Sequence, residues 1–388
     1  MEKVRYGIIG IGNMGRAHAL SLVNEIKGAE LTAVCDISAE RLEWAAERLP
    51  AGVLHYLSPA EMFEAHTIDA VLIATPHYDH PTLAIEAFNY GYHVLIEKPA
   101  GVYTKAVQEM NDAAAKSTVK FGIMYNQRTN PLYKKLRDLI QSGELGEIRR
   151  TNWIITNWYR SQNYYDSGGW RATWGGEGGG VLLNQDPHQL DLWQWTTGMM
   201  PKRVRAFCHF GKYRKIEVED DVTAYVEYEN GATGLFVTTT GEAPGTNRFE
   251  ITGDNGKIVV EDNQLTFWRL RTPEPQFNAE YKGGFGSPEC WKCEIPVEEG
   301  HGDQHKGILR NFTNAILNDE PLLAPGEEGI HGLTLSNAMY LSAWTDNWVD
   351  LPIDADLFHE KLMVQVNNST FKKEAIVSAK ALDVSGTH

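Results

Sequence analysis

The chain has 388 residues, 42% of them hydrophobic, which is enough material for two or three domains with packed cores. Its formal net charge of -15 disfavours nucleic acid and anionic membrane surfaces as partners. No apolar run approaches the roughly 18–20 residues that cross a bilayer, and no secretory leader precedes the first strand pattern, so we expect a cytoplasmic protein.

The N-terminal residues have the pattern of a dinucleotide-binding βαβ unit. A strand over residues 4–9 runs directly into a G-x-G-x-x-G loop, and an amphipathic helix follows. In this context Gly10 permits a tight turn, Gly12 lets the backbone approach a pyrophosphate, and Gly15 lets the helix pack against the strand. Phosphates bind well at a helix N-terminus, so we also place Asn13 and Met14 of this loop among the cofactor contacts.

The second strand, residues 31–35, ends at Asp36, about twenty residues past the glycines. A carboxylate there accepts hydrogen bonds from the adenosine ribose and repels a 2′-phosphate. Arg41 is expected on the following helix, for which Ser38 is the better N-cap. These features favour NAD over NADP as the cofactor.

The βα rhythm continues with strands over residues 69–74 and 92–96. Ligands of such sheets bind at the carboxyl ends of the strands. At or just beyond these ends, and beyond the strand that closes at Tyr125, lie the remaining candidate cofactor contacts, which are Thr75, Pro76, His80, Glu97, Lys98 and Gln127.

From residue 126 onward the pattern changes from alternating βα units to a β-rich region. A helix over 131–142 precedes strands near 147–158, 202–210, 221–229, 233–240, 247–252 and 257–261, with hairpin signals such as Asn230-Gly231. Helices over 308–317 and 332–344 should return to pack on the fold. We therefore predict a Rossmann domain over 1–125 and a substrate-binding and oligomerisation α/β domain over 126–388.

Residues 153–174 combine aromatic rings with arginines and lead into a glycine-rich stretch over 175–180. A sugar site needs rings for C–H faces and polar groups for hydroxyls. At least half of these rings are expected in a core or subunit interface instead, Trp153 and Trp174 especially. The candidate substrate contacts are Asn126, Arg128, Tyr159, Arg160, Trp170, Arg171 and Asn184.

The later part of the chain gives no sign of a metal centre. We interpret the acidic run over residues 217–221 as a solvated loop or strand edge. Cys290 and Cys293 form a single C-x-x-C pair without the two further ligands that a structural zinc requires. His305 precedes the last pair of long helices, and an exposed cap region is its expected environment.

Four motifs occur together and in order: the glycine loop over 10–15, A-T-P-x-x-x-H over 74–80, E-K-P over 97–99, and a glycine triplet over 178–180 followed by His188-x-x-Asp191. With them the chain resembles the Gfo/Idh/MocA oxidoreductases over essentially its whole length. The resemblance implies a Rossmann domain followed by an α/β domain built on a large open, mainly antiparallel sheet. It also implies a homodimer or homotetramer.

The resemblance assigns the reacting lysine to Lys98, with a Lys–Pro peptide that is often cis in the family. Oxidation of an alcohol needs a group that takes its proton while hydride leaves. A free lysine, with a pKa of about 10.4, is too basic for this at neutral pH. Burial and a cationic nicotinamide would both lower the pKa of Lys98.

The resemblance also assigns a catalytic role to His188. Asp186 and Pro187 predict a capped helix start, and the helix dipole would keep His188 neutral in its first turn. Asn184 stands where many relatives carry aspartate, so acid–base duty falls to Lys98 and His188. Asp191 either orients His188 or is a plain helix residue.

These features predict an NAD-dependent oxidoreductase that moves hydride between a sugar or cyclitol hydroxyl and nicotinamide. The alternative is an NAD-dependent glycosidase that acts on a glycoside by transient oxidation, elimination, hydration and re-reduction. A non-catalytic NAD or sugar sensor is a third hypothesis, which the presence of both Lys98 and His188 disfavours.

Overall fold

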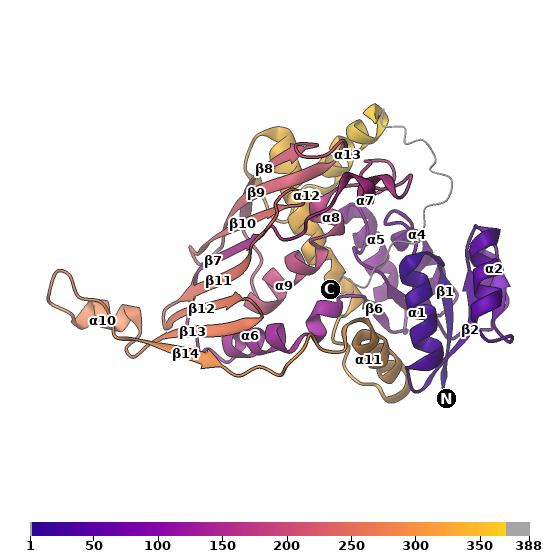
Figure 1. Cartoon of the computed structure of the whole chain (residues 1–388), viewed down its shortest axis with the longest axis horizontal. Helices are drawn as coiled ribbons and strands as arrows, with labels where there is room; N and C mark the ends of the chain where they lie inside the picture. Colours follow the sequence, from indigo (N-terminus) through magenta and orange to yellow (C-terminus); the bar gives the residue numbers. More distant parts are fainter. Residues whose placement is uncertain (1, 370–388) are drawn as a thin grey trace.

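The computed structural model describes residues 2–369, which form two sheets with helices packed around and between them (Figure 1). The first sheet has six parallel strands in the order β3-β2-β1-β4-β5-β6. This is the Rossmann order, with a crossover on each side of β1. Its strands are β1 (Val4–Ile9), β2 (Ala29–Cys35), β3 (Leu54–Tyr56), β4 (Ala70–Ile73), β5 (His93–Ile96) and β6 (Phe121–Ile123).

The central strands of this sheet are short apolar runs because helices cover both of their faces. All four residues of β4 are fully buried, as are Val94, Leu95 and Ile96 of β5. The connecting helices are α1 (Asn13–Asn24), α2 (Ala39–Arg48), α3 (Pro59–Glu64), α4 (Asp79–Asn89) and α5 (Thr104–Ala115). The predicted dinucleotide-binding architecture is confirmed.

The second sheet has nine strands in the order β14-β13-β12-β11-β7-β10-β9-β8-β15. Only the β7–β10 pair is parallel, so the sheet is mainly antiparallel, as predicted. Its strands are β7 (Ile148–Ile155), β8 (Arg203–Phe210), β9 (Glu219–Glu227), β10 (Thr233–Thr239), β11 (Asn247–Gly253), β12 (Gly256–Glu261), β13 (Gln264–Leu270), β14 (Cys290–Ile295) and β15 (Val349–Asp350).

Helices α6 (Pro131–Gln141), α9 (Pro187–Thr197) and α12 (Gly329–Thr345) lie between the second sheet and the Rossmann part (Figure 1). Trp153 on β7 and Trp174 are buried, as expected of core rings. The sequence did not predict the edge strands β13 and β14 or helix α10 (Glu274–Glu280), which lies in an arm that projects from this edge of the sheet (Figure 1). None of the described helices is both long and apolar enough to cross a membrane.

The chain returns to the first sheet late in the sequence. Helix α11 (Gln304–Asn318) packs beside α1 and β1, where Tyr6 Oη and Thr313 Oγ1 are 2.8 Å apart. A bridge between Gly122 and Pro325 then adds a further contact. Residues 126–369, the described part of the second predicted domain, therefore do not pack as one separate unit, and the division into 1–125 and 126–388 stays a prediction.

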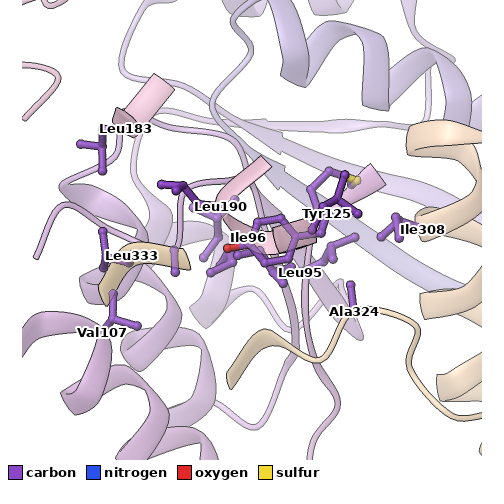
Figure 2. Packing of buried hydrophobic residues seen from close by; sticks show 14 of the residues in the cluster. Leu95, Ile96, Val107, Tyr125, Leu183, Leu190, Ile308, Ala324 and Leu333 are labelled. Carbon is purple, nitrogen blue, oxygen red and sulfur yellow. The ribbon is translucent and has the colours of Figure 1, made fainter. Parts of the chain in front are cut away.

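One buried cluster joins the two parts of the molecule (Figure 2). It brings Leu95 and Ile96 of β5 together with Leu190 of α9 and Leu333 of α12, around the ring of Tyr125. The strand that leads to Lys98 and the helix that carries His188 thus share a hydrophobic core. Close packing of such a core fixes the relative positions of the two elements.

The acidic run over 217–221 is not solvated as predicted, because Glu219 and Asp220 are fully buried at the start of β9. Glu219 accepts hydrogen bonds from the backbone of Gly180 and Leu182 and from the hydroxyl of Tyr340. Burial nevertheless raises the pKa of Glu219 to about 7. Long-range donors of this kind, which offset the cost of burying a carboxyl group, leave no signal in the local sequence.

Candidate active site

The predicted cofactor residues meet at one edge of the first sheet, because the carboxyl ends of parallel strands lie on the same side. Gly10 has φ +93°, and a Cβ on Gly15 would lie only 1.8 Å from the carbonyl oxygen of Gly10. Both positions therefore require glycine. A Cβ on Gly12 would meet nothing within 4 Å, so there is open space at the start of α1.

This open space fits a dinucleotide pyrophosphate. Gly12 is the N-cap of α1, and Asn13 and Met14 lie in the first turn, where backbone N–H groups lack helical partners. Thr75 follows β4 at the same edge, and its buried hydroxyl has no hydrogen-bond partner among the described residues. Pro76 beside it is exposed. The individual contacts of Asn13, Met14, Thr75 and Pro76 with the cofactor stay predictions.

Asp36 lies at the end of β2, where its carboxylate is fixed by the glycine loop. Its Oδ2 accepts from the Ile11 amide at 2.7 Å, and its Oδ1 accepts from the Ser38 amide at 2.9 Å. Arg41, on α2 as expected, reaches back to Oδ2 at 3.2 Å, and Ser38 occupies the N-cap of that helix. The carboxylate of Asp36, which we expect to contact the ribose, is therefore paired with the guanidinium of Arg41.

Replacing Asp36 with alanine is expected to weaken NAD binding by about tenfold and to improve the relative use of NADP. The change removes an acceptor for the ribose and frees Arg41 for a 2′-phosphate. Binding of the two cofactors is compared by titration, with Asp36→Ala/Arg41→Ala as the control that should lose the gain in NADP. An unaltered cofactor preference would show that Asp36 does not contact the ribose.

Two other predicted cofactor residues, His80 and Glu97, contact groups of the protein itself. The ring nitrogens of His80 lie 2.8 Å from the Pro99 carbonyl and 2.9 Å from the Thr75 carbonyl. His80 thus lies between the loops that follow β4 and β5, and its direct contact with the cofactor stays a prediction. Glu97 pairs with buried His18 on α1 at 2.6 Å.

The carboxyl group of Glu97 is kept ionised in this pair. Burial alone would raise the pKa of Glu97, but the hydrogen bond from His18 and the charges of His18 and His305 lower it to about 2. His305 itself stacks at an angle on His18, with ring centroids 5.6 Å apart. The sequence predicted an exposed cap region for His305, but the residue is half-buried and lies against His18 at the edge of the site.

Lys98 follows β5, and its ammonium donates to the Asn184 carbonyl at 2.9 Å. The Lys98–Pro99 peptide is cis, as the resemblance implied. Burial lowers the pKa of Lys98, and the positive charges of Arg171 and Arg160 act in the same direction. Lys98 and Asn184 are therefore in contact although 86 positions separate them in the sequence.

His188 lies in the first turn of α9, as predicted, and its Nδ1 is buried without a hydrogen-bond partner in the described part of the chain. Its pKa is well below the usual value because of burial first, and then because of the charges of Lys98 and His305. The lowered pKa of His188 agrees with the prediction, but its cause is burial and neighbouring charges rather than the helix dipole. The imidazole is neutral and close enough to Lys98 to sense its charge.

Asp186 occupies the N-cap position of α9 but does not cap the helix with its side chain. Both carboxyl oxygens are buried without a hydrogen-bond partner among the described residues. Burial raises the pKa of Asp186 well above its ordinary range. The predicted capping interaction is wrong, although the predicted position is right.

Arg128 was predicted to contact substrate, and the structure contradicts this. The guanidinium is fully buried and donates to both carboxylate oxygens of Asp191 at 2.8 and 2.6 Å. It also donates to Glu328 at 2.5 Å. Asp191 is committed to this ion pair, so it does not orient His188. Arg128 follows a strand end, as site residues do, but its side chain turns into the core.

The other substrate candidates include a connected set beside Lys98. Asn184 donates to the Glu177 carboxylate, and also to the Tyr164 hydroxyl at 3.4 Å. Arg171 donates to the same hydroxyl at 2.9 Å and lies over the ring of Trp170 at 4.7 Å. Glu177 and Tyr164 were not predicted as site residues, and Glu177 places a carboxylate next to the amide that replaces the usual aspartate.

Five further positions complete the description of the site. His77, also missed, has its ring edge-on to Trp170 at 5.6 Å, and the charge of Lys98 contributes to its lowered pKa after burial. Asn126 and Gln127 both donate to Gln304, at 2.5 and 3.4 Å. Arg160 lies over the ring of Tyr164 at 5.2 Å, whereas Tyr159 points outward and is 51% exposed.

Comparison with known protein families gives two matches to one family. The oxidoreductase family with an NAD-binding Rossmann fold, Gfo/Idh/MocA, matches residues 4–125, and the Gfo/Idh/MocA C-terminal domain matches residues 133–259. The chain belongs to the Gfo/Idh/MocA family. It is therefore an NAD-binding oxidoreductase by family, as predicted.

Individual relatives agree with this membership. The chain is 32% identical to the rhizopine catabolism protein MocA of Rhizobium meliloti, over 53% of this chain and 61% of that protein. It is 26% identical to myo-inositol 2-dehydrogenase of Thermotoga maritima, over 86% and 95% of the two chains. The WlbA dehydrogenase of Chromobacterium violaceum, solved with NADH and UDP-GlcNAcA, is 31% identical with a TM-score of 0.77, covering 91% of this chain and 97% of that one.

Proposed function

We propose that the protein oxidises a hydroxyl group of a sugar or cyclitol with NAD, or catalyses the reverse reduction. The observation that carries the proposal is the position of Lys98, whose ammonium is held 2.9 Å from the Asn184 carbonyl beside the neutral ring of His188. Relatives named for inositol oxidation, and one solved with a nucleotide sugar, support a carbohydrate-like substrate. We also propose a homodimeric or homotetrameric assembly.

Proton movement in this proposal rests on Lys98 and His188. Bound NAD supplies the hydride acceptor. Neutral Lys98 accepts the hydroxyl proton, so the substrate loses one proton and one hydride and its carbinol becomes a carbonyl. His188, neutral and without a partner for Nδ1 in the described structure, is available to hydrogen-bond the reacting oxygen or pass the proton on.

The pH dependence of the reaction follows from the lowered pKa of Lys98. Oxidation requires the neutral amine, so kcat/KM should rise with pH through this pKa and then level off, below the pH at which a free lysine titrates. Reduction requires the protonated amine and should fall through the same pKa. Initial rates in both directions, over about pH 5 to 10, test this. Parallel profiles in the two directions would contradict it.

The function is tested by a paired screen of purified protein with NAD against free sugars, inositols and aryl glycosides. NADH absorbance and aglycone release are read together. Stoichiometric NADH without aglycone release supports the proposal. Aglycone release that needs catalytic NAD, without NADH accumulation, would replace it with the oxidative glycosidase. Binding of NAD and sugar without either signal would leave a sensor.

A further inference from the structure

A cavity of about 630 Å³ lies at the turn between β8 and β9, open to solvent. Its walls are formed by Tyr159 and Gln162 on one side and by residues 211–215 on the other. Gln162 joins the two sides, because its amide accepts from the Lys215 backbone at 2.8 Å and donates to the Lys215 carbonyl at 3.3 Å. A cavity of this volume lies within the range of small-molecule sites.

The charge of the cavity is opposite to that of the whole chain. Three of the five residues over 211–215 are Lys212, Arg214 and Lys215, in a protein with a formal net charge of -15. Lys212 is balanced by Asp221 at 3.1 Å. Arg214 and Lys215 form no ion pair with any described residue. Two cations therefore lack an anion.

Arg214 is held in place by the protein with one nitrogen left over. Its Nε donates to the Arg160 carbonyl at 2.7 Å, and its Nη1 donates to the Tyr213 carbonyl at 3.0 Å. Its Nη2 is buried without a hydrogen-bond partner in the described structure. The guanidinium also stacks on the ring of Tyr159 at 5.1 Å. A buried donor that lacks a partner is costly unless a ligand satisfies it.

The turn itself is shaped by a buried acid. Asp220 accepts hydrogen bonds from the backbone amides of residues 212, 213 and 214, at 2.9, 2.8 and 3.0 Å. The backbone of the turn supplies these three bonds, so the carboxylate of Asp220 forms no ion pair with Arg214 or Lys215. The cavity is thus built by the fold rather than left by a loose loop.

A short series of contacts joins this cavity to Lys98. Arg214 donates to the carbonyl of Arg160, whose guanidinium lies over Tyr164. The Tyr164 hydroxyl accepts from Asn184, and the Asn184 carbonyl accepts from Lys98. This series of contacts links the wall of the cavity to the residues beside Lys98.

We propose that this cavity binds an anionic group, a phosphoryl or carboxylate substituent, carried by the sugar or cyclitol whose hydroxyl reacts at Lys98. The inference rests on the proposed function for the identity of the reacting group. Arg214 binds the anion through its free nitrogen, Lys215 adds charge, and Tyr159 forms the wall. Guanidinium is well suited to phosphate and carboxylate because its donors match their oxygens.

The test measures binding to NADH-saturated protein, which cannot oxidise the ligand. D-glucose, D-glucose 6-phosphate, UDP-glucose and D-glucuronate are titrated by calorimetry into the wild-type protein and into Arg214→Gln and Lys215→Gln. We expect at least one anionic titrant to bind tenfold or more tightly than glucose, and Arg214→Gln to remove most of that preference. Arg271→Gln, an exposed arginine at the base of the arm, is the matched control and should keep it.

The choice of titrants and variants distinguishes the possible results. Preference for the phosphorylated titrants or for glucuronate identifies which anion is bound. Equal binding of all four titrants, or a preference that survives both Arg214→Gln and Lys215→Gln, overturns the proposal. Because no turnover is measured, the result is independent of whether the protein oxidises sugars, so failure of the proposed function would be seen separately in the screen.

Discussion

Replacing Lys98 with alanine is expected to abolish hydride transfer, lowering kcat/KM by about 10³-fold or more, with less than about a threefold change in the Kd of NAD. The ammonium contacts the Asn184 carbonyl on the substrate side, away from the glycine loop that would hold the pyrophosphate. Loss of the side chain therefore removes the proton acceptor without removing the cofactor site. NADH formation and cofactor titration measure the two quantities.

Two further variants make this result specific. Lys98→Arg retains a positive charge but cannot give up its proton, so it should be as inactive as Lys98→Ala. Lys105→Ala, an exposed lysine paired with Asp356 on the surface, should behave as the wild-type protein. Turnover by Lys98→Arg near the wild-type rate would show that the lysine acts only as a charge and not as the base.

The parts of the fold that could be predicted from sequence are those with a local physical cause. The glycine loop is one, because the positive φ of Gly10 and the close approach at Gly15 restrict the residue type within six consecutive positions. Asp36 is another, since it directly follows a buried strand and lies beside the loop that it contacts. Strand order followed from the same βα rhythm.

The parts that could not be predicted depend on partners far along the chain. Glu177 accepts from Asn184, which also donates to Tyr164, only because the glycine-rich segment folds back beside α8 (Val181–Asn184). Asp220 is buried only because a turn several residues earlier supplies its donors. An acidic or aromatic residue has the same local sequence signal whether it faces solvent, a ligand or such a partner.

Replacing Arg128 with methionine is expected to lower the free energy of unfolding by about 3–5 kcal/mol, because it leaves the carboxylate of Asp191 buried without its cation. The side chains of Arg128 and Asp191 are each only 1% exposed. Asp191 is 63 residues from Arg128 in sequence, and the second carboxylate partner of Arg128, Glu328, is 200 residues away. Denaturant unfolding, with and without saturating NAD, measures the loss.

The same experiment decides between the two roles that Arg128 has been given. A structural ion pair predicts lost stability with KM little changed in the fraction that remains folded, and Arg128→Met/Asp191→Leu should recover part of the stability because no unpaired charge remains on that helix. A substrate contact predicts the reverse, a raised KM with stability unaltered. Since the guanidinium is buried against α9, one turn from His188, the ion pair acts on catalysis only by holding that helix in place.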